Sequence, residues 1–164
     1  MKRIKFFVIA VLFFVSFCVS ACGVEESITY SDTAEENAAE GNYDMENTLK
    51  LNIDGKKVAV SWEDNDSVSA LKNLAKNGAI TVNMSRYGGF EQVGSLGVNL
   101  KREDERITTS PGDIVLYSGN QIVIFYGSNT WAYTRLGKIT DKTQAELSSL
   151  LGEKDVDIII TYGE

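Results

Sequence analysis

The chain has 164 residues, with 16 Lys and Arg against 23 Asp and Glu, and its formal net charge at pH 7 is −7. It contains no histidine, which excludes Ser-His-Asp and Cys-His catalysis and zinc sites with histidine ligands. Chemistry in this chain therefore depends on arginine, lysine, tyrosine, serine or carboxylate groups, and we expect neither a metal ion nor a cofactor.

Residues 1–21 have the pattern of an export signal. A basic start precedes an apolar run over residues 6–19, which suits a signal peptide and is short for a spanning helix of about 20 residues. The run ends in Val19-Ser20-Ala21-Cys22, which resembles the lipobox of bacterial lipoproteins, whose cysteine becomes lipidated. The resemblance implies a lipid anchor on Cys22 at the extracytoplasmic face of the cell membrane, since two acyl chains anchor a protein stably. The alternative is a plain secretory signal with an incidental cysteine.

Residues 22–47 follow as an acidic segment. They contain no lysine or arginine and no periodic apolar pattern, so they bury too little surface to offset the entropy of ordering. We expect a disordered tether between the membrane and a single folded domain, residues 48–164. Without the first 47 residues the charges nearly balance and no basic stretch remains, so nucleic acid is not an expected partner. Cys18 leaves with the signal, so the mature chain has no free thiol and no disulfide.

The domain begins with two strands and a helix. Apolar residues alternate over 49–53 and again over 58–62, and Asp54-Gly55 lies between them, which predicts a hairpin with a type I′ turn. Over residues 64–78 the apolar spacing becomes helical, with Asp66 or Ser67 as the N-cap and Gly78 as the stop.

Strands predominate in the rest of the domain. Residues 79–85 alternate again, a glycine-rich segment follows, and residues 101–110 form a polar loop around a short strand. Pro111-Gly112-Asp113 predicts a turn before a second hairpin formed by residues 114–117 and 122–127. An irregular strand, a second helix and a final strand are then predicted over 131–139, 143–152 and 156–163, with a capping box at Thr143 and Glu146.

These elements predict a mainly β domain. No long helix connects successive strands, which disfavours a parallel sheet. We expect a closed antiparallel β-barrel with two short capping helices, because closure removes exposed strand edges.

The order of the motifs resembles the cyclophilin fold, and most closely the small bacterial cyclophilin-like domains, over nearly all of 48–164. Arg86, Gly89-Phe90, Gln92 and Gly94 repeat the order of an arginine and a Pro-Gly-Phe-x-x-Gln-Gly-Gly-like run in cyclophilins. The segment NQIVIFYG resembles the Ser-Gln-Phe-Phe-Ile strand of that family, and RLGKI its Phe-Gly-Lys-Val run. The resemblance implies the fold and a proline pocket.

Two departures fall on that pocket. The spacings from Arg86 to Phe90 and to Gln92 are shorter than in cyclophilins, and the histidine beside their pocket is absent, with Tyr133 the nearest replacement. We therefore predict a non-catalytic module that binds a peptide, a small anionic ligand or an envelope protein around Arg86. The alternative is a peptidyl-prolyl cis-trans isomerase that assists the folding of exported proteins.

Arg86 is the residue best suited to chemistry. A guanidinium offers five donors in a rigid fork and stays charged, so it holds a carboxylate or a peptide carbonyl. In an isomerase it would donate toward the prolyl nitrogen and lower a barrier of about 18–20 kcal/mol, with Gln92 as the second catalytic residue. The alternative is an exposed turn arginine, or one paired with Glu91.

We predict that the rings of Phe90, Phe125, Tyr126, Trp131 and Tyr133 line the pocket together with Arg86 and Gln92. For Phe125 the alternative is a place in the core, because it alternates within a strand. For Gln92 it is structural support of a strand end. Residues 63–66 carry oxygen ligands but lack the spacing of a calcium loop, so no metal site is predicted.

Overall fold

The computed structural model describes residues 48–163. The predicted signal, the lipidated Cys22 and the tether all lie outside these residues. Within the described part of the chain, neither helix is long and apolar enough to cross a membrane.

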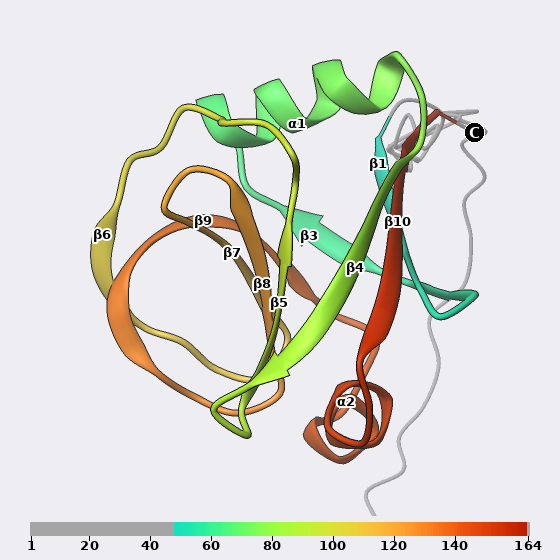
Figure 1. Cartoon of the computed structure of the whole chain (residues 1–164), viewed down its shortest axis with the longest axis vertical. Coiled ribbons are helices and arrows are strands. Elements are labelled where there is room, and N and C mark those ends of the chain that lie inside the picture. Colours follow the sequence, from blue (N-terminus) through green and yellow to red (C-terminus); the bar gives the residue numbers. More distant parts are fainter. Residues whose placement is uncertain (1–47, 164) are drawn as a thin grey trace, which may run out of the picture. The chain divides into compact units, whose positions relative to one another are not determined.

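Ten strands and two helices make up the described domain (Figure 1). In chain order they are β1 (Leu49–Ile53), β2 (Lys56–Val58), β3 (Val60–Trp62), α1 (Asp66–Lys76), β4 (Ile80–Tyr87), β5 (Glu91–Ser95), β6 (Glu105–Thr108), β7 (Asp113–Tyr117), β8 (Gln121–Phe125), β9 (Thr130–Ile139), α2 (Gln144–Leu151) and β10 (Val156–Tyr162). The predicted elements are thus all present, in the predicted order.

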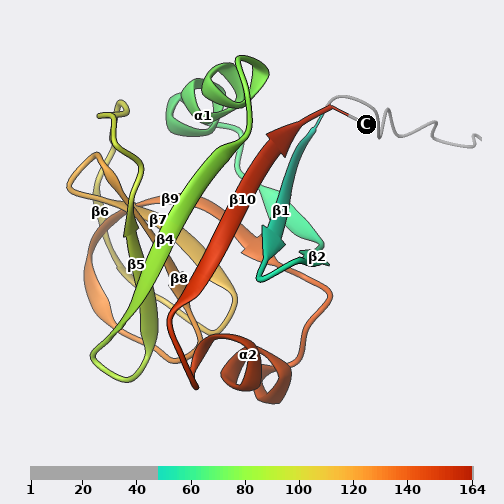
Figure 2. The same ribbon diagram turned by 45° about the vertical axis from the view of Figure 1, so that its right-hand side comes forward.

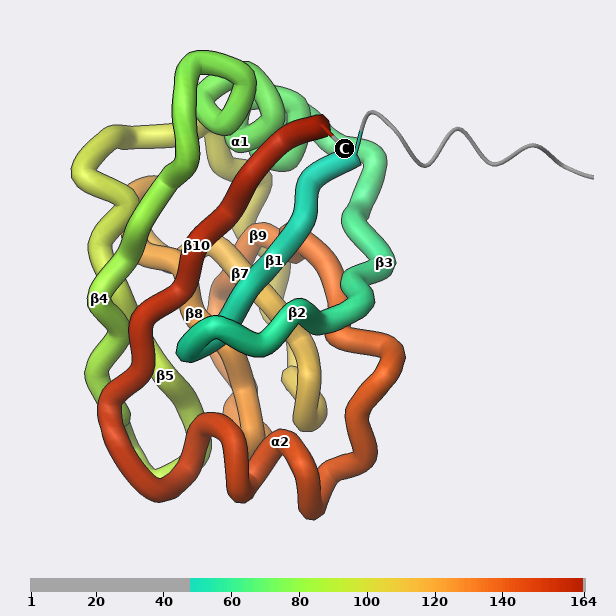
Figure 3. Tube along the Cα trace, turned by 90° about the vertical axis from the view of Figure 1, so that its right-hand side faces the viewer, coloured from blue at the N-terminus to red at the C-terminus, as the bar shows by residue number. Residues whose placement is uncertain are grey.

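The strands form one antiparallel sheet in the order β2-β1-β10-β4-β5-β8-β7-β9-β3, and β6 pairs with the first half of β9. The sheet curls into a nearly closed barrel, which confirms the predicted fold class. Figure 2 shows β4, β10 and β1 side by side on one wall. Figure 3 shows α1 and α2 at opposite ends of the barrel.

The barrel closes where β1 and β3 approach each other, although these two strands do not pair with one another. The indole nitrogen of Trp62 donates a hydrogen bond to the carbonyl oxygen of Leu49 at 2.9 Å. The sequence predicts one continuous strand up to Trp62, but the structure divides it at Ala59. The carbonyl oxygen of Ala59 accepts from the amide of Thr140 at 2.9 Å. Before this residue the chain pairs with β1, as β2, and after it the chain pairs with β9, as β3.

Local sequence signals account for the turns and helix ends. Asp54 and Gly55 have φ values of 48° and 80°, as the type I′ turn requires. Thr143 and Glu146 form the predicted capping box of α2. The N-cap of α1 is Asn65, whose side chain accepts from the amide of Val68 at 2.9 Å. It replaces the expected Asp66 or Ser67 because Asp66 lies in the first helical turn, paired with Lys101.

Two apolar clusters lie on opposite faces of β7 and β8. The main core lies inside the barrel and includes Ile114, Leu116, Ile122 and Ile124. The second cluster contains Val115, Val123, Phe125 and Tyr133. Because both faces are covered, these strands are apolar without alternation. The second face is where the candidate site lies.

Candidate functional site

A cavity of about 420 Å³ opens on the face of β5, β7 and β8 opposite the main core. Its lining comes from the neighbouring strands β4, β5, β8, β7 and β9 and from the loop before β9. The lining residues are Tyr87, Glu91, Val93, Tyr117, Gln121, Val123, Asn129, Trp131 and Tyr133. The volume is within the range of small-molecule sites, and the mixture of rings with a few polar groups is typical of them.

Glu91 is the only acidic or basic residue in this lining. It pairs with Tyr87 of β4 and with Phe125 of β8 across the sheet, and only 6% of it is exposed. Its Oε2 atom is buried and has no hydrogen-bond partner among the described residues. Burial disfavours the charged form and raises the pKa of Glu91 from 4.5 to about 7.

Aromatic side chains make up half of the remaining lining. The rings of Tyr117 and Tyr133 meet edge to face, with centroids 5.9 Å apart. Tyr87 and Trp131 remain 67% and 54% exposed. Two rings therefore lie deep in the cavity and two reach solvent.

Asn129 sets the direction of the Tyr133 hydroxyl. Its side-chain nitrogen donates to the Tyr133 oxygen at 3.0 Å, which leaves the phenol proton free for another acceptor. Burial, and secondarily the negative charge of Glu91, raises the pKa of Tyr133. Tyr133 is therefore a neutral hydrogen-bond donor at physiological pH.

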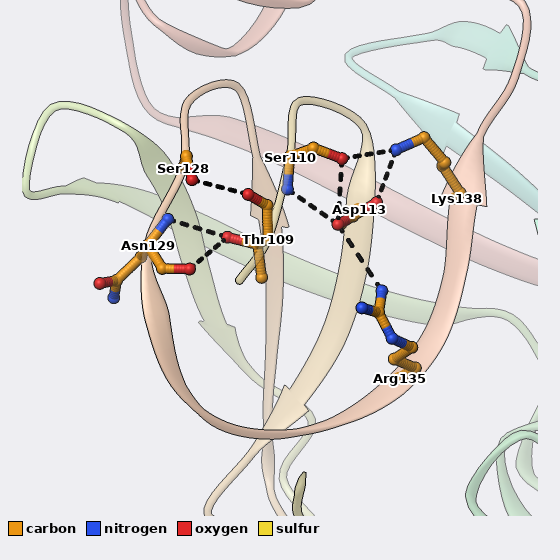
Figure 4. Close-up of polar contacts among 7 residues, drawn as sticks. All are labelled: Thr109, Ser110, Asp113, Ser128, Asn129, Arg135 and Lys138. Carbon is orange, nitrogen blue, oxygen red and sulfur yellow. Dashed lines mark hydrogen bonds and ion pairs between the residues drawn. The ribbon is translucent and has the colours of Figure 1, made fainter. Parts of the chain in front are cut away.

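Thr109 in turn fixes Asn129 (Figure 4). The Thr109 hydroxyl accepts from the Asn129 amide at 3.0 Å, and the Thr109 amide donates to the Asn129 carbonyl at 2.8 Å. Ser128 donates its hydroxyl to the Thr109 carbonyl at 2.7 Å. These bonds tie the loop before β9 to the segment that leads from β6 into β7.

The same segment is held on its other side by Asp113, a buried acid (Figure 4). Asp113 accepts from the Ser110 amide at 2.8 Å and from the Lys138 ammonium at 2.8 Å, and Arg135 lies 3.7 Å away. This acid is paired, in contrast to Glu91. We assign it a structural role, because its partners satisfy it within the fold.

The structure places Arg86 and Gln92 away from this cavity. They pair across β4 and β5, on the face opposite Tyr87 and Glu91, because neighbouring side chains of a strand alternate. The guanidinium of Arg86 donates to the carbonyl oxygen of Gly152 at 3.0 Å. The amide of Gln92 donates to the carbonyl oxygens of Leu151 and Lys154 at 2.6 and 2.7 Å.

The remaining predicted residues lie at or beneath the cavity. Tyr133 lines it. Phe125 is fully buried below it and stacks with Phe90 at a centroid distance of 6.4 Å. Trp131 also lines the cavity as predicted, whereas Tyr126 belongs to the main core. The sequence analysis missed Tyr87, Glu91 and Tyr117 as cavity residues. The available signal was Glu91 itself, an acid that alternation places on the same face as Val93.

A second, smaller hollow of about 200 Å³ lies on the other side of Tyr133. Glu63, Glu103 and Glu105 line it together with Arg135. These acids do not form a metal site: within residues 48–163, no cluster of three or more acidic side chains is arranged to hold a metal ion.

Comparisons with known proteins concern the whole barrel. A model of the family described as cyclophilin-like matches residues 51–162. The solution structure of a hypothetical protein from Archaeoglobus fulgidus superimposes with a TM-score of 0.51 and 16% sequence identity, over 74% of this chain and 98% of that chain. At that identity the likeness shows the fold alone. No curated protein matches the chain.

Proposed function

This chain belongs to the cyclophilin-like family, and we propose that its barrel is a binding module whose ligand occupies the cavity at Glu91 and Tyr133. One observation carries the proposal: a buried carboxyl without a hydrogen-bond partner faces a cavity of ligand size with aromatic walls. Buried polar groups in proteins are nearly always paired. A bound ligand that supplies the missing partner accounts for both the cavity and the acid.

The role we propose is non-catalytic. A prolyl isomerase needs a donor directed at the prolyl nitrogen, and the predicted donor was Arg86 with Gln92. Both side chains hydrogen-bond to backbone carbonyls at the end of α2, on the sheet face away from the cavity. What supports binding over isomerisation is thus that, among residues 48–163, no arginine lines the cavity.

We further propose that the module is attached to the extracytoplasmic face of the cell membrane through a lipid on Cys22. The support is the sequence Val19-Ser20-Ala21-Cys22 after an apolar run. The ligand would then be a peptide, a small molecule or part of an envelope protein. Of the ligand classes predicted from the sequence, the small anion is disfavoured, because the carboxylate of Glu91 repels it.

A fragment library tests the binding proposal. Amide chemical shifts of the full chain are recorded by NMR with each fragment, and we expect ligands that shift the amides of β5 and β8. Gln121→Trp is the matched control, because its larger side chain fills the mouth of the cavity and should abolish those shifts. Hits that persist unchanged in Gln121→Trp, or no hits at β5 and β8, would rule the cavity out.

A protease-coupled proline-peptide assay tests the alternative function. We expect no acceleration of isomerisation by the wild type. Acceleration that Arg86→Ala abolishes would establish the isomerase instead. For the anchor, Cys22→Ser should move the protein from the membrane fraction to the soluble fraction, and an unchanged distribution would contradict lipidation.

A further inference from the structure

We infer that the cavity recognises an alkylammonium group, with its nitrogen at the carboxyl of Glu91 and its aliphatic part against the aromatic walls. This inference rests on the proposed function and specifies the chemical class of its ligand. Three independent features of the cavity lead to it: the unpaired acid, the rings and the absence of a basic residue from the lining.

The first feature is the unpaired acid. An ionised carboxylate accepts up to about four hydrogen bonds, yet Oε2 of Glu91 is buried without one. Asp113 shows how this fold treats a buried acid that has only a structural role: an ammonium, a backbone amide and a hydroxyl surround it. Glu91 lacks these partners among residues 48–163, and a bound ligand would supply them.

The second feature is the charge around Glu91. The titratable groups that face it are phenols, Tyr87 on β4, Tyr117 on β7 and Tyr133 on β9, and β8 contributes only Gln121 and Val123. No lysine or arginine belongs to the lining among the described residues. The nearest arginine in sequence, Arg86, is bound to Gly152 on the other face. When Glu91 is ionised, a cationic ligand would supply the compensating positive charge that the described lining lacks.

The third feature is the wall. Tyr87, Tyr117, Trp131 and Tyr133 present four π systems around one acid. The face of an aromatic ring carries negative potential and attracts ammonium groups within about 6 Å, tryptophan most strongly. The same rings bury an alkyl chain well. An ammonium with a short aliphatic stem satisfies the ionised acid and the rings together, whereas an anionic ligand satisfies the rings only.

The protonation state of Glu91 distinguishes an alkylammonium ligand from a neutral ligand that accepts a hydrogen bond. Burial places the pKa of Glu91 at about 7, so both forms are populated near neutral pH. A cation binds the ionised form, and its affinity rises as pH increases through that pKa. A ligand carbonyl binds the protonated form instead, and its affinity falls over the same range. The sign of the pH dependence therefore decides between a cation and a neutral acceptor.

The test uses three matched probes on the full chain: n-butylammonium, n-butanol and n-butyrate. They have similar size, and they carry a positive, a neutral and a negative head group. NMR titration follows the amides of Glu91, Val123 and Tyr133. We expect butylammonium to bind at least tenfold more tightly than the other two, since hydrogen bonds to charged groups contribute more than neutral ones. Its affinity should rise about tenfold between pH 6 and pH 8.

Two variants locate the interaction. Glu91→Gln keeps the shape of the side chain and removes its charge, and it should weaken butylammonium about tenfold or more without changing the affinity for butanol. Trp131 is 54% exposed, so Trp131→Ala should fold like the wild type. It should weaken the binding of butylammonium about threefold to tenfold. Glu105→Gln is the matched control, because Glu105 lines the separate hollow, and it should leave the affinity unchanged.

A lysine derivative and its Nε-acetylated form show whether the ammonium can come from a protein side chain. Nα-acetyl-lysine N-methylamide represents a lysine side chain of a protein partner, and butylammonium represents a free amine; Nε-acetylation of the lysine probe should abolish its binding. Equal affinity for the three butyl probes, no effect of Glu91→Gln, or tighter binding at pH 6 would overturn the alkylammonium inference. Fragment hits in the cavity would still support the proposed function, which fails only if that library also finds none.

Discussion

The side-chain amide of Gln92 donates a hydrogen bond of 2.6 Å to the carbonyl oxygen of Leu151, the last residue of α2. The two residues are 59 positions apart in the chain. The same nitrogen donates to the carbonyl oxygen of Lys154 at 2.7 Å, and the backbone amide of Arg86 donates to the side chain of Asp155 at 2.9 Å. Strands β4 and β5 thus hold the end of α2 and the loop that leads into β10.

Gln92→Ala should destabilise the fold. Gln92 is fully buried, and its loss leaves the buried carbonyl group of Leu151 and the partly buried one of Lys154 without this donor and creates a cavity. We expect a loss of about 2–4 kcal/mol in the free energy of unfolding, measured by urea denaturation. Gln144→Ala, at an exposed position of α2, is the control and should change the stability by less than about 0.5 kcal/mol. Equal stability of both variants would remove the structural role of Gln92.

Arg86→Ala should have a small effect on stability and none on ligand binding. Its guanidinium is exposed and makes one hydrogen bond to a carbonyl oxygen near the C-terminal end of α2, so we expect a loss of about 0.5–1 kcal/mol. Because Arg86 lies across the sheet from the cavity, fragments that bind the wild type should bind Arg86→Ala equally well. If NMR showed that these fragments no longer bind Arg86→Ala, Arg86 would be part of the binding site.

The pH dependence of stability should reveal Glu91. Its pKa is about 7 in the folded protein and near 4.5 when unfolded, so the folded state binds its proton more tightly. The stabilisation is complete below about pH 4.5 and is lost as the pH rises to about 7. At pH 8 the wild type should be roughly 2–3 kcal/mol less stable than if this carboxyl were neutral.

Glu91→Gln isolates this contribution. The difference in unfolding free energy between Glu91→Gln and the wild type should grow in favour of the variant from pH 4.5 to pH 8. Denaturation curves recorded across this range measure it. Glu105→Gln supplies the comparison, and its difference from the wild type should stay nearly constant. A difference that does not change with pH for Glu91→Gln would show that the carboxyl is ionised normally.

Trp62→Phe tests the closure of the barrel. The substitution keeps an aromatic ring but removes the indole donor that meets the Leu49 carbonyl, and we expect a loss of about 1–2 kcal/mol by urea denaturation. Hydrogen exchange of the β1 and β3 amides should accelerate more than that of β7 and β8. Trp131→Phe, which changes an exposed ring, should leave exchange in β1 and β3 unaffected. Uniform acceleration throughout the domain in Trp62→Phe would contradict a local closing role.

By itself, the sequence determined both helices, most of the strands and their order. The Asp54-Gly55 turn, the capping box at Thr143 and Glu146 and the alternation of the strands are local signals, because they depend on residues a few positions apart. Together with the missing helical crossovers they predicted the antiparallel barrel and its two helices. The structure added β5, where the sequence indicated only a glycine-rich segment, and divided the second strand at Ala59.

The tertiary structure alone decided which residues share the site. Alternation states that Glu91 and Gln92 point to opposite faces, but β5 is buried on both faces, and burial alone does not say which of them meets a ligand. That outcome depends on distant partners: carbonyl groups at the end of α2 accept from the side chains of Gln92 and Arg86, while β9 brings Trp131 and Tyr133 to the cavity at Glu91 without pairing its carboxyl. Such contacts join residues dozens of positions apart, and no pattern within a strand encodes them.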